Sequence, residues 1–453
     1  MKSFTEAIYY RSPTLLQNLL VSAYGYKLYH KRYAGSLYRD IMEKVRLSRS
    51  WSSEEIEAYQ SERLHEMVKH CRLNIPYYQQ QFSEHGIHEN DITATEHITR
   101  LPILQKETLK ENSQLFSQPG TKPFMLQHTS GSTGTPLALE VDERTYKLAM
   151  ALLVDHEETH GVPFGAKRAT FAGRMLKPAD DMKPPFSRFN RAENQKLFSS
   201  YHLNGKTFPH YQKELDQFQP IELIGYPSAI YDLASQYQNS DSKPGFQPKA
   251  IITNSESLLV WQRETIESVF GCTVYDYYGT AEYVMFAGQD KAGVYQPNPL
   301  IGIAEVDVRS DTIDTGNLLA TSLSNRQMPL LRYNLGDTAT LANANHPTVG
   351  TPTLKSINGR IDDYIETRDG RFVGRIDHIF KGVSGVREAQ VVQVFPGSAT
   401  VKLVKDSSSS FNETSLISNC KQRLGDDFQI AIEFVSEIER GKNGKFRSVV
   451  RQK

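Results

Sequence analysis

Apolar residues recur at helical spacing through the first quarter of the chain, up to about residue 115. Residues 52–55 read Ser-Ser-Glu-Glu, which is typical of a helix start, because serine caps free backbone N–H groups and acids favour the first turn. The helical spacing continues to His70, and Pro76 then interrupts it. The pattern therefore predicts a mainly helical segment over residues 1–115.

From about residue 124 the pattern changes to short apolar runs separated by glycines and by helical stretches. The runs predicted to be buried strands are 223–225, 250–253 and 272–275, and the stretches predicted to be helices are 226–239 and 258–270. Alternating strands and helices indicate a sheet with helices on its faces. Residues 300–341 are richer in alternating positions and predict a smaller β subdomain.

A further change of pattern follows residue 360. Residues 367–371 read Thr-Arg-Asp-Gly-Arg and predict a hairpin, and the elements expected after it are strands at 389–395, 399–404 and 429–435 and a helix at 412–423. We therefore predict an α/β protein of two domains. The large domain comprises 1–360, with a helical segment (1–115), a sheet core (116–299) and a β subdomain (300–360); the small, mobile α+β domain comprises 361–453.

Length and composition agree with this division. Domains usually hold about 100–200 residues, and the chain has 453, of which 39% are hydrophobic. Its 52 basic side chains balance 52 acidic ones, so no basic field favours nucleic acid. The three cysteines (Cys71, Cys272 and Cys420) are too scattered for a disulfide framework or a clustered zinc motif, which predicts a reducing compartment, the cytoplasm.

The N-terminal region lacks the pattern of a secretory signal, and no run of about 18 apolar residues predicts a membrane span. Residues 14–38 nevertheless combine leucines and tyrosines with lysines and an arginine. Such a segment is either an interfacial helix on a membrane surface or a helix that packs on its own domain and exposes its charges. We expect the second, with peripheral membrane contact at most.

The clearest candidate for chemistry is the segment 129–136, Thr-Ser-Gly-Ser-Thr-Gly-Thr-Pro. Its glycines let backbone N–H groups approach an anion, and its hydroxyls add donors, which suits a triphosphate. A plain polar turn has the same composition. Because no Gly-Lys-Ser/Thr ends the segment, it is not a Walker A loop.

Four further motifs follow in order. Residues 275–282 (Tyr-Asp-Tyr-Tyr-Gly-Thr-Ala-Glu) come just after a predicted strand and offer an aromatic face for a base and a carboxylate for Mg²⁺. Residues 332–337 end in an aspartate after a glycine, suited to ribose hydroxyls. Residues 359–363 lie at the domain boundary, and 441–447 (Gly-Lys-Asn-Gly-Lys-Phe-Arg) form a lysine-bearing loop. Each alone is compatible with a surface turn, but five in this order are hard to obtain by chance.

In this order the five motifs resemble the core motifs of the adenylate-forming superfamily of acyl-CoA synthetases, luciferases and peptide-synthetase adenylation domains. Within it the chain is most similar to the phenylacetate-CoA ligase-like branch, which includes CapK-type proteins of polysaccharide gene clusters; residues 59–82 also resemble that branch. The resemblance covers nearly the whole chain. It implies that ATP activates a carboxylic acid as an acyl-AMP with release of pyrophosphate, and that the acyl group then passes to an amine or to CoA.

The resemblance also implies a role for each motif. Lys445 would contact the substrate carboxylate and the α-phosphate, Arg360 would reach the nucleotide, and Asp362 would be the hinge of the small domain. Lys445 is preferred to Lys442 because Gly-Lys-Phe-Arg fits the family's Gly-Lys-x-x-Arg ending more closely, with its arginine one place early. The expected nucleotide-binding residues are Thr129, Ser130, Gly131, Ser132, Thr133 and Gly134 at the phosphates, Tyr278 at the adenine with Gly279 and Thr280 of the same motif, Glu282 with Mg²⁺, and Asp337 at the ribose.

Two positions depart from the family pattern. Thr135 replaces the usual lysine of the phosphate loop, and Ala281 replaces the usual hydroxyl residue before the magnesium-binding glutamate. They leave open an alternative, a nucleotide-binding relative that acts as a binding protein without turnover.

The acyl pocket of this family lies between the phosphate and adenine loops. The candidate substrate residues there are Arg174, Tyr226, Ser228, Ser255 and Glu256. Arg174 is either a recognition site for a polar or second carboxylate group or an ordinary surface arginine. The CapK-like character suggests an acid of envelope or capsule synthesis, a uronic or amino acid, with an amine as acceptor.

Residues 156–160 match a different motif, His-Glu-x-x-His, which places two zinc ligands on one helix face. No third ligand follows at the metzincin spacing, and Pro163 stands where that pattern has glycine. A zinc hydrolase is thus the remote alternative. We expect instead a solvent-facing helix end that is capped by Gly161.

Overall fold

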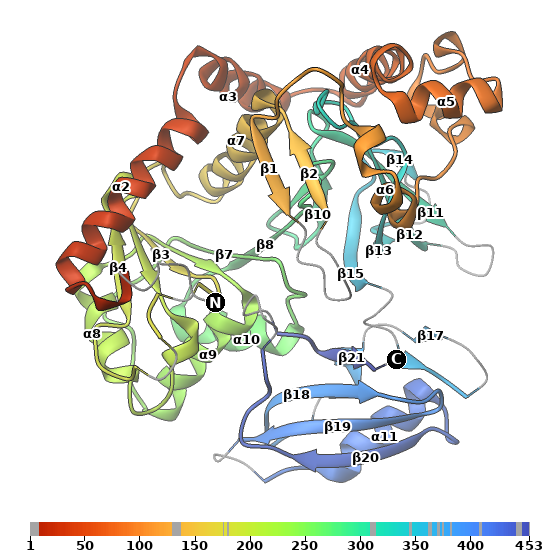
Figure 1. Cartoon of the computed structure of the whole chain (residues 1–453). Coiled ribbons are helices and arrows are strands. Elements are labelled where there is room, and N and C mark those ends of the chain that lie inside the picture. Colours follow the sequence, from red (N-terminus) through yellow and green to blue (C-terminus); the bar gives the residue numbers. More distant parts are fainter. Residues whose placement is uncertain are drawn as a thin grey trace.

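The computed structural model describes residues 9–128, 137–174, 176–178, 181–308, 314–343, 347–360, 365–368, 372–373, 376–380, 383–406, 410–440 and 446–452. Figure 1 shows a large body of helices around a long sheet, with a small unit at the C-terminal end of the chain beneath it. We call residues 365–452 the C-terminal unit. Among the described residues, no helix has the length and apolar character needed to cross a membrane.

The first 115 residues are mainly helical, as predicted. The helices are α2 (Thr14–Tyr33), α3 (Ser36–Ser48), α4 (Ser53–Asn74), α5 (Pro76–His85) and α6 (Lys106–Glu111). Ser52 caps α4: its hydroxyl accepts from the N–H of Glu55 at 3.2 Å, and the Glu55 carboxylate accepts from the N–H of Ser52 at 2.7 Å. Pro76 opens α5, where a missing N–H costs nothing.

One sheet of 13 strands runs through the large body, in the order β14-β11-β12-β13-β15-β10-β9-β8-β7-β6-β3-β5-β4. Its strands are β3 (Arg168–Phe171), β4 (Ser187–Asn190), β5 (Gln195–Phe198), β6 (Glu222–Gly225), β7 (Ala250–Asn254), β8 (Val274–Gly279), β9 (Phe286–Gln289), β10 (Tyr295–Pro297), β11 (Gly302–Val308), β12 (Thr315–Ser322), β13 (Tyr333–Leu341), β14 (Val349–Gly350) and β15 (Leu354–Arg360). A separate pair, β1 (Met125–His128) and β2 (Ala138–Val141), lies beside it.

The half of the sheet from β5 to β8 is parallel and is buried on both faces. Leu223 and Ile251 belong to a core shared with α8 (Phe208–Phe218), α9 (Pro227–Asn239) and α10 (Val260–Phe270). The next residue of each strand, Ile224 and Ile252, belongs to a different core, which includes Val162, just after α7 (Glu143–Thr159). The predicted strand–helix alternation is therefore confirmed, with helices on the faces of the sheet.

The motif 275–282 lies differently from the prediction. It was expected in a loop after a strand ending at residue 275, but β8 begins at Val274 and continues through Gly279. The strand extends because Asn254 of β7 pairs with Tyr277, and β9 pairs with residues 277–279 on the other side.

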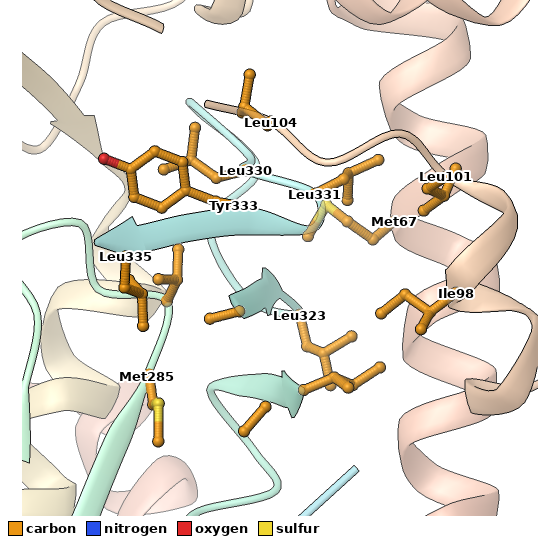
Figure 2. Close-up of a cluster of buried hydrophobic side chains, with 14 of the residues drawn as sticks. Met67, Ile98, Leu101, Leu104, Met285, Leu323, Leu330, Leu331, Tyr333 and Leu335 are labelled. Carbon is orange, nitrogen blue, oxygen red and sulfur yellow. The ribbon is translucent and has the colours of Figure 1, made fainter. Parts of the chain in front are cut away.

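The strands β11 to β15 form an antiparallel part of the same sheet, and β10 and β9, also antiparallel, connect β15 to β8 of the parallel half. The largest hydrophobic core among the described residues lies between these strands and the helical segment. In Figure 2, Met67, Ile98 and Leu101 point from the helical segment toward Leu323 and Leu331. The strands and the N-terminal helices thus stabilise each other.

The C-terminal unit is a small α+β fold, as predicted. It contains the short hairpin β16 (Ile365–Glu366) and β17 (Phe372–Val373), the helix α11 (Glu413–Leu424), and a sheet in the order β20-β19-β18-β21, formed by Gln429–Phe434, Ser398–Lys405, Val386–Gln393 and Val449–Arg451. Val401, Leu403, Leu416 and Cys420 are buried in a core of its own.

Helix α2 packs on its own domain, as expected, but the side chains that it exposes are not mainly charged. It lies against β4, the edge strand of the large sheet. An edge strand has backbone groups without a neighbouring strand, and α2 meets them with polar residues: Asn18 accepts from the N–H of Phe189 at 3.0 Å, and Ser22 donates to its carbonyl at 3.2 Å. Four leucines of α2, at positions 15, 16, 19 and 20, are consequently exposed.

Candidate active site

Four adjacent parallel strands, β3, β6, β7 and β8, end at one edge of the large sheet, which we call the carboxyl edge. Their pairing places Phe171 beside Gly225 and Gly225 beside Thr253. Most of the predicted site residues that the structure describes follow these strand ends or lie at the end of β8: Arg174, Tyr226, Ser228, Ser255, Glu256, Tyr278, Gly279, Thr280 and Glu282. Open α/β sheets bind ligands at this edge, so the fold brings the predicted substrate and nucleotide residues to one place.

Two backbone features shape the carboxyl edge. A Cβ atom on Gly225 would lie 2.0 Å from the carbonyl oxygen of Phe171, so only glycine permits this approach. Beyond it, the N–H of Tyr226 donates to the same carbonyl at 2.9 Å. Ser255 has a φ of 68°, an uncommon conformation for a residue with a side chain, and such residues cluster at functional sites.

The nucleotide motifs meet at the end of β8. The Tyr278 hydroxyl donates to the Asp337 carboxylate, and the Tyr333 hydroxyl donates to Glu282 Oε1 at 3.3 Å. Asp337 pairs with Arg360 between β13 and β15, which brings a third motif to the same place. Three strands separate β8 from β13 in the sheet, about 19 Å if the sheet were flat. The sheet must therefore bend for Tyr278 to reach Asp337.

Tyr226 occupies the centre of the predicted substrate residues. Burial raises the pKa of its hydroxyl, and the nearby Glu256 carboxylate and Tyr201 raise it further, while Arg174 lowers it. Tyr201 donates to the carbonyl of Gly173 at 3.1 Å. Tyr201 was not predicted from the sequence, because it lies in a short turn (200–202) that carries no motif.

Glu256 joins the carboxyl edge to the C-terminal unit. Its carboxylate accepts from the N–H of Ser228 at 3.1 Å and from the N–H of Phe446 at 2.6 Å. Burial raises the pKa of Glu256, and these hydrogen bonds oppose the rise. Phe446 directly follows Lys445 in the sequence. Sequence reasoning missed this contact, since 190 residues separate its partners.

Two more contacts hold the C-terminal unit against α9. Arg440 lies between two carboxylates, with Nη2 at 3.1 Å from Asp232 and 3.1 Å from Glu388. The Tyr231 hydroxyl donates to the carbonyl of Arg387 at 3.3 Å.

Several predicted residues lie outside the described part of the chain. They are Thr129, Ser130, Gly131, Ser132, Thr133, Gly134, Asp362 and Lys445. Arg360 is placed by its backbone, at the end of β15.

The residues that match His-Glu-x-x-His pack inside the protein, and the prediction that they face solvent is wrong. His156, Glu157 and His160 are all buried, because the end of α7 packs against the sheet. The His160 ring stacks on Tyr275 at 3.5 Å, and Glu157 accepts from Arg168 at 2.6 Å.

The expected cap of this helix is confirmed. The helix α7 ends at Thr159, and Gly161 follows the C-cap residue His160 with a φ of 85°, the left-handed conformation that commonly terminates a helix. Within the described residues, no three His, Cys, Asp or Glu side chains are grouped so as to hold a metal ion.

Comparison with known proteins agrees with this geometry. Residues 365–452 match the family model of the CapK C-terminal domain. Over 451 residues the chain is 28% identical to Protein CapK of Staphylococcus aureus, covering 98% of each chain. Over 333 residues it is 25% identical to a phenylacetate-coenzyme A ligase of Pseudomonas putida, covering 70% of this chain and 73% of the other. The chain is homologous to CapK and to the phenylacetate-CoA ligases. The resemblance inferred from the five motifs is thereby confirmed.

A solved structure extends the likeness to the whole fold of this CapK homologue. A 2-hydroxyisobutyryl-CoA ligase in the postadenylation state, in complex with R3-HIB-AMP, superposes with a TM-score of 0.66 at 18% identity, covering 89% of this chain and 91% of the other. The same ligase in the thioesterification state superposes with a TM-score of 0.53. The adenylate-forming fold, with its C-terminal domain, is the fold of this chain.

Proposed function

We propose that this chain is an AMP-forming carboxylate ligase. It activates a carboxylic acid with ATP, releases pyrophosphate, and passes the acyl group from the acyl-adenylate to an amine or to CoA. The observation that carries the proposal is the convergence of Tyr278, Glu282 and Asp337 at the carboxyl edge, in a homologue of CapK and the phenylacetate-CoA ligases.

The nucleotide would lie along the end of β8. Tyr278 supplies an aromatic face for adenine, and its hydroxyl bond to Asp337 orients the carboxylate that would accept from the ribose hydroxyls. Glu282 is half-buried, with one oxygen held by Tyr333, and a carboxylate oxygen fits the preference of Mg²⁺. Mg²⁺ would neutralise charge on the phosphates. By family resemblance, residues 129–134 would surround those phosphates.

Adenylation requires a cation beside the reacting groups, because a carboxylate and a phosphate repel each other. Lys445 is the proposed source of that charge. The contact between Glu256 and Phe446 supports this role, since it holds the residue next to Lys445 at the carboxyl edge. The better superposition on the postadenylation state than on the thioesterification state supports an adenylation-like orientation of the C-terminal unit. A rotation about Asp362 would then admit the acceptor.

The acid would bind around Tyr226, where Arg174 is exposed to solvent and near enough to affect the pKa of the tyrosine. A cation and hydroxyl groups suit a polar acid. Together with the likeness to CapK, this favours a uronic or amino acid of envelope or capsule synthesis, with an amine as acceptor.

The test is pyrophosphate release from ATP and Mg²⁺ over a panel of carboxylic acids. We expect acid-dependent release that falls about 10²–10³-fold in Lys445→Ala, because removal of one preorganised donor typically costs that much. Lys442→Ala, three residues earlier in the same motif, is the matched control and should retain activity.

Two results would change the assignment. ATP binding without pyrophosphate release for any acid would favour a nucleotide-binding relative without turnover, to which Thr135 and Ala281 point. Activity with simple aryl acids alone, forming thioesters with CoA, would overturn the polar acid and the amine acceptor.

A further inference from the structure

Helix α2 is amphipathic in the opposite sense to an ordinary surface helix. The side that faces the protein is polar: Gln17 is buried and accepts from Arg188 Nε at 2.5 Å, and Ser22 accepts from the N–H of Arg191 at 3.1 Å. Gly25 lies so close to Asn190 that a Cβ atom would fall 2.1 Å from its side chain. These contacts fix the helix, and they fix which side faces outward.

The outward side of α2 is apolar. Six large side chains of this one helix are exposed: Leu15 (84%), Leu16 (43%), Leu19 (64%), Leu20 (43%), Tyr24 (60%) and Tyr26 (48%). In Figure 1 the helix, in red, runs along the rim of the large body, away from the C-terminal unit. A grouped apolar surface of this kind marks an interaction site, whereas single exposed leucines need no explanation.

The charges of this region all have one sign. Residues 7–39 contain no aspartate or glutamate but carry five cationic residues, Arg11, Lys27, Lys31, Arg32 and Arg39, although the whole chain is neutral. Arg32 is paired with Glu193 at 2.9 Å, and Lys31 donates to the carbonyl of Phe124 at 2.8 Å. Arg11, just before α2, and Lys27, on α2, are exposed.

We infer that α2 docks on an anionic lipid surface, with its leucines in the lipid and its basic residues at the headgroups. Tyrosines suit the same boundary, because the ring is apolar and the hydroxyl is polar. The positive charge of this region favours a lipid surface over a second copy of the chain. Two copies of the helix would bring like charges together, whereas anionic headgroups complement the basic residues. Docking would place the carboxylate ligase at a membrane surface, a property separate from its catalysis.

The test is flotation of the full chain with vesicles. Phosphatidylcholine vesicles with phosphatidylglycerol are compared with phosphatidylcholine alone, at low and high salt. We expect binding to the anionic vesicles that weakens with salt. The affinity should fall about tenfold or more in Leu15→Ser/Leu19→Ser, which removes apolar contact, and about tenfold in Lys27→Glu, which reverses a charge.

The matched control is Leu47→Ser/Leu73→Ser, two leucines of other helices exposed at 58% and 56%. It should bind like wild type, and ATP binding should be unchanged in every variant, because α2 lies outside the proposed site. Absence of binding, or equal binding by all variants, would overturn the inference. A dimer in light scattering without lipid, abolished by Leu15→Ser/Leu19→Ser, would show instead that a second copy covers this face.

Discussion

Tyrosine hydroxyls donate hydrogen bonds to carboxylates at several places in the sheet, and the depth of burial of each carboxylate indicates its role. Asp337 and Glu282 accept from Tyr278 and Tyr333 and are half-buried at the carboxyl edge. Asp276, in the middle of β8, accepts from the hydroxyls of Tyr295 and Thr253 at 2.6 Å each, and burial raises its pKa to about 7. Half-buried carboxylates remain accessible to a ligand, whereas Asp276 serves the core.

Asp337→Ala should raise the KM for ATP. A hydrogen bond to a charged group contributes about 1.5–3 kcal/mol, so an increase of about tenfold to a hundredfold is expected in the pyrophosphate assay. Glu433→Gln, an exposed carboxylate on β20, is the control and should leave KM unchanged. An unaltered KM in Asp337→Ala would contradict the proposed ribose contact.

His156 should make the protein sensitive to acid. Burial lowers the pKa of His156 to about 3 from an ordinary value near 6.5, so the unfolded chain gains a proton before the folded chain does. The stability that neutral His156 provides is complete above pH 6.5 and is lost as the pH falls toward 3, by up to about 1.4 kcal/mol for each pH unit.

Urea unfolding of His156→Leu as a function of pH tests this expectation. The variant should lose less stability than wild type between pH 6.5 and 3, because leucine does not titrate. His85→Gln, on the exposed end of α5, should keep the wild-type profile. Parallel profiles for His156→Leu and wild type would refute the expectation.

At the scale of elements, the ends of strands β3 and β6 can lie this close together only because residue 225 is a glycine and has no side chain. Gly225→Ala would place a methyl group 2.0 Å from the Phe171 carbonyl, and the strands would have to separate. We expect the free energy of unfolding to fall by about 2 kcal/mol or more, with loss of pyrophosphate release.

Gly205→Ala is the control, since the nearest atom to its new methyl group is 3.7 Å away. Both stabilities are measured by urea unfolding. Equal stability of the two alanine variants would show that the approach of β6 to β3 is not constrained.

The loop after β7 provides one of the contacts between the large body and the C-terminal unit. Glu256→Gln replaces one acceptor with a donor that faces an N–H, either that of Ser228 or that of Phe446. Pyrophosphate release should fall about tenfold while ATP binding is retained, because the effect is on the position of Phe446, which follows Lys445 in the sequence. Glu264→Gln, exposed on α10, should match wild type; a loss of ATP binding in Glu256→Gln would point to a different role.

At the scale of the whole molecule, the C-terminal unit has its own core and touches α9 through polar contacts. Polar contacts of this kind are typical of domain interfaces that permit relative motion. Arg440 is central to it, because it is shared by Asp232 on α9 and Glu388 on β18.

Arg440→Ala should slow acyl-adenylate formation more than acyl transfer, since it weakens the orientation seen here. Single-turnover measurements of the two half-reactions would detect the difference. Arg451→Ala, which breaks an ion pair with Glu366 inside the C-terminal unit, is the control. Equal slowing of both steps by Arg440→Ala would indicate a general loss of stability instead.

The sequence by itself determined the local structure and the order of the motifs. The cap at Ser52, the break at Pro76 and the strands β6 and β7 depend on neighbouring residues and on periodicity, which a sequence displays directly. The five motifs likewise retain their order whatever the fold, and this order carried the resemblance to adenylate-forming enzymes.

Only the tertiary structure decided which faces are covered and which distant residues meet. Tyr278 reaches Asp337 because the sheet bends, and Glu256 reaches Phe446 across 190 residues because two units pack together. His156 is buried and Leu15 is exposed, contrary to expectation, because periodicity tells how a helix is divided into faces but not which face a neighbour covers. That choice depends on packing partners from elsewhere in the chain, such as the free edge of β4.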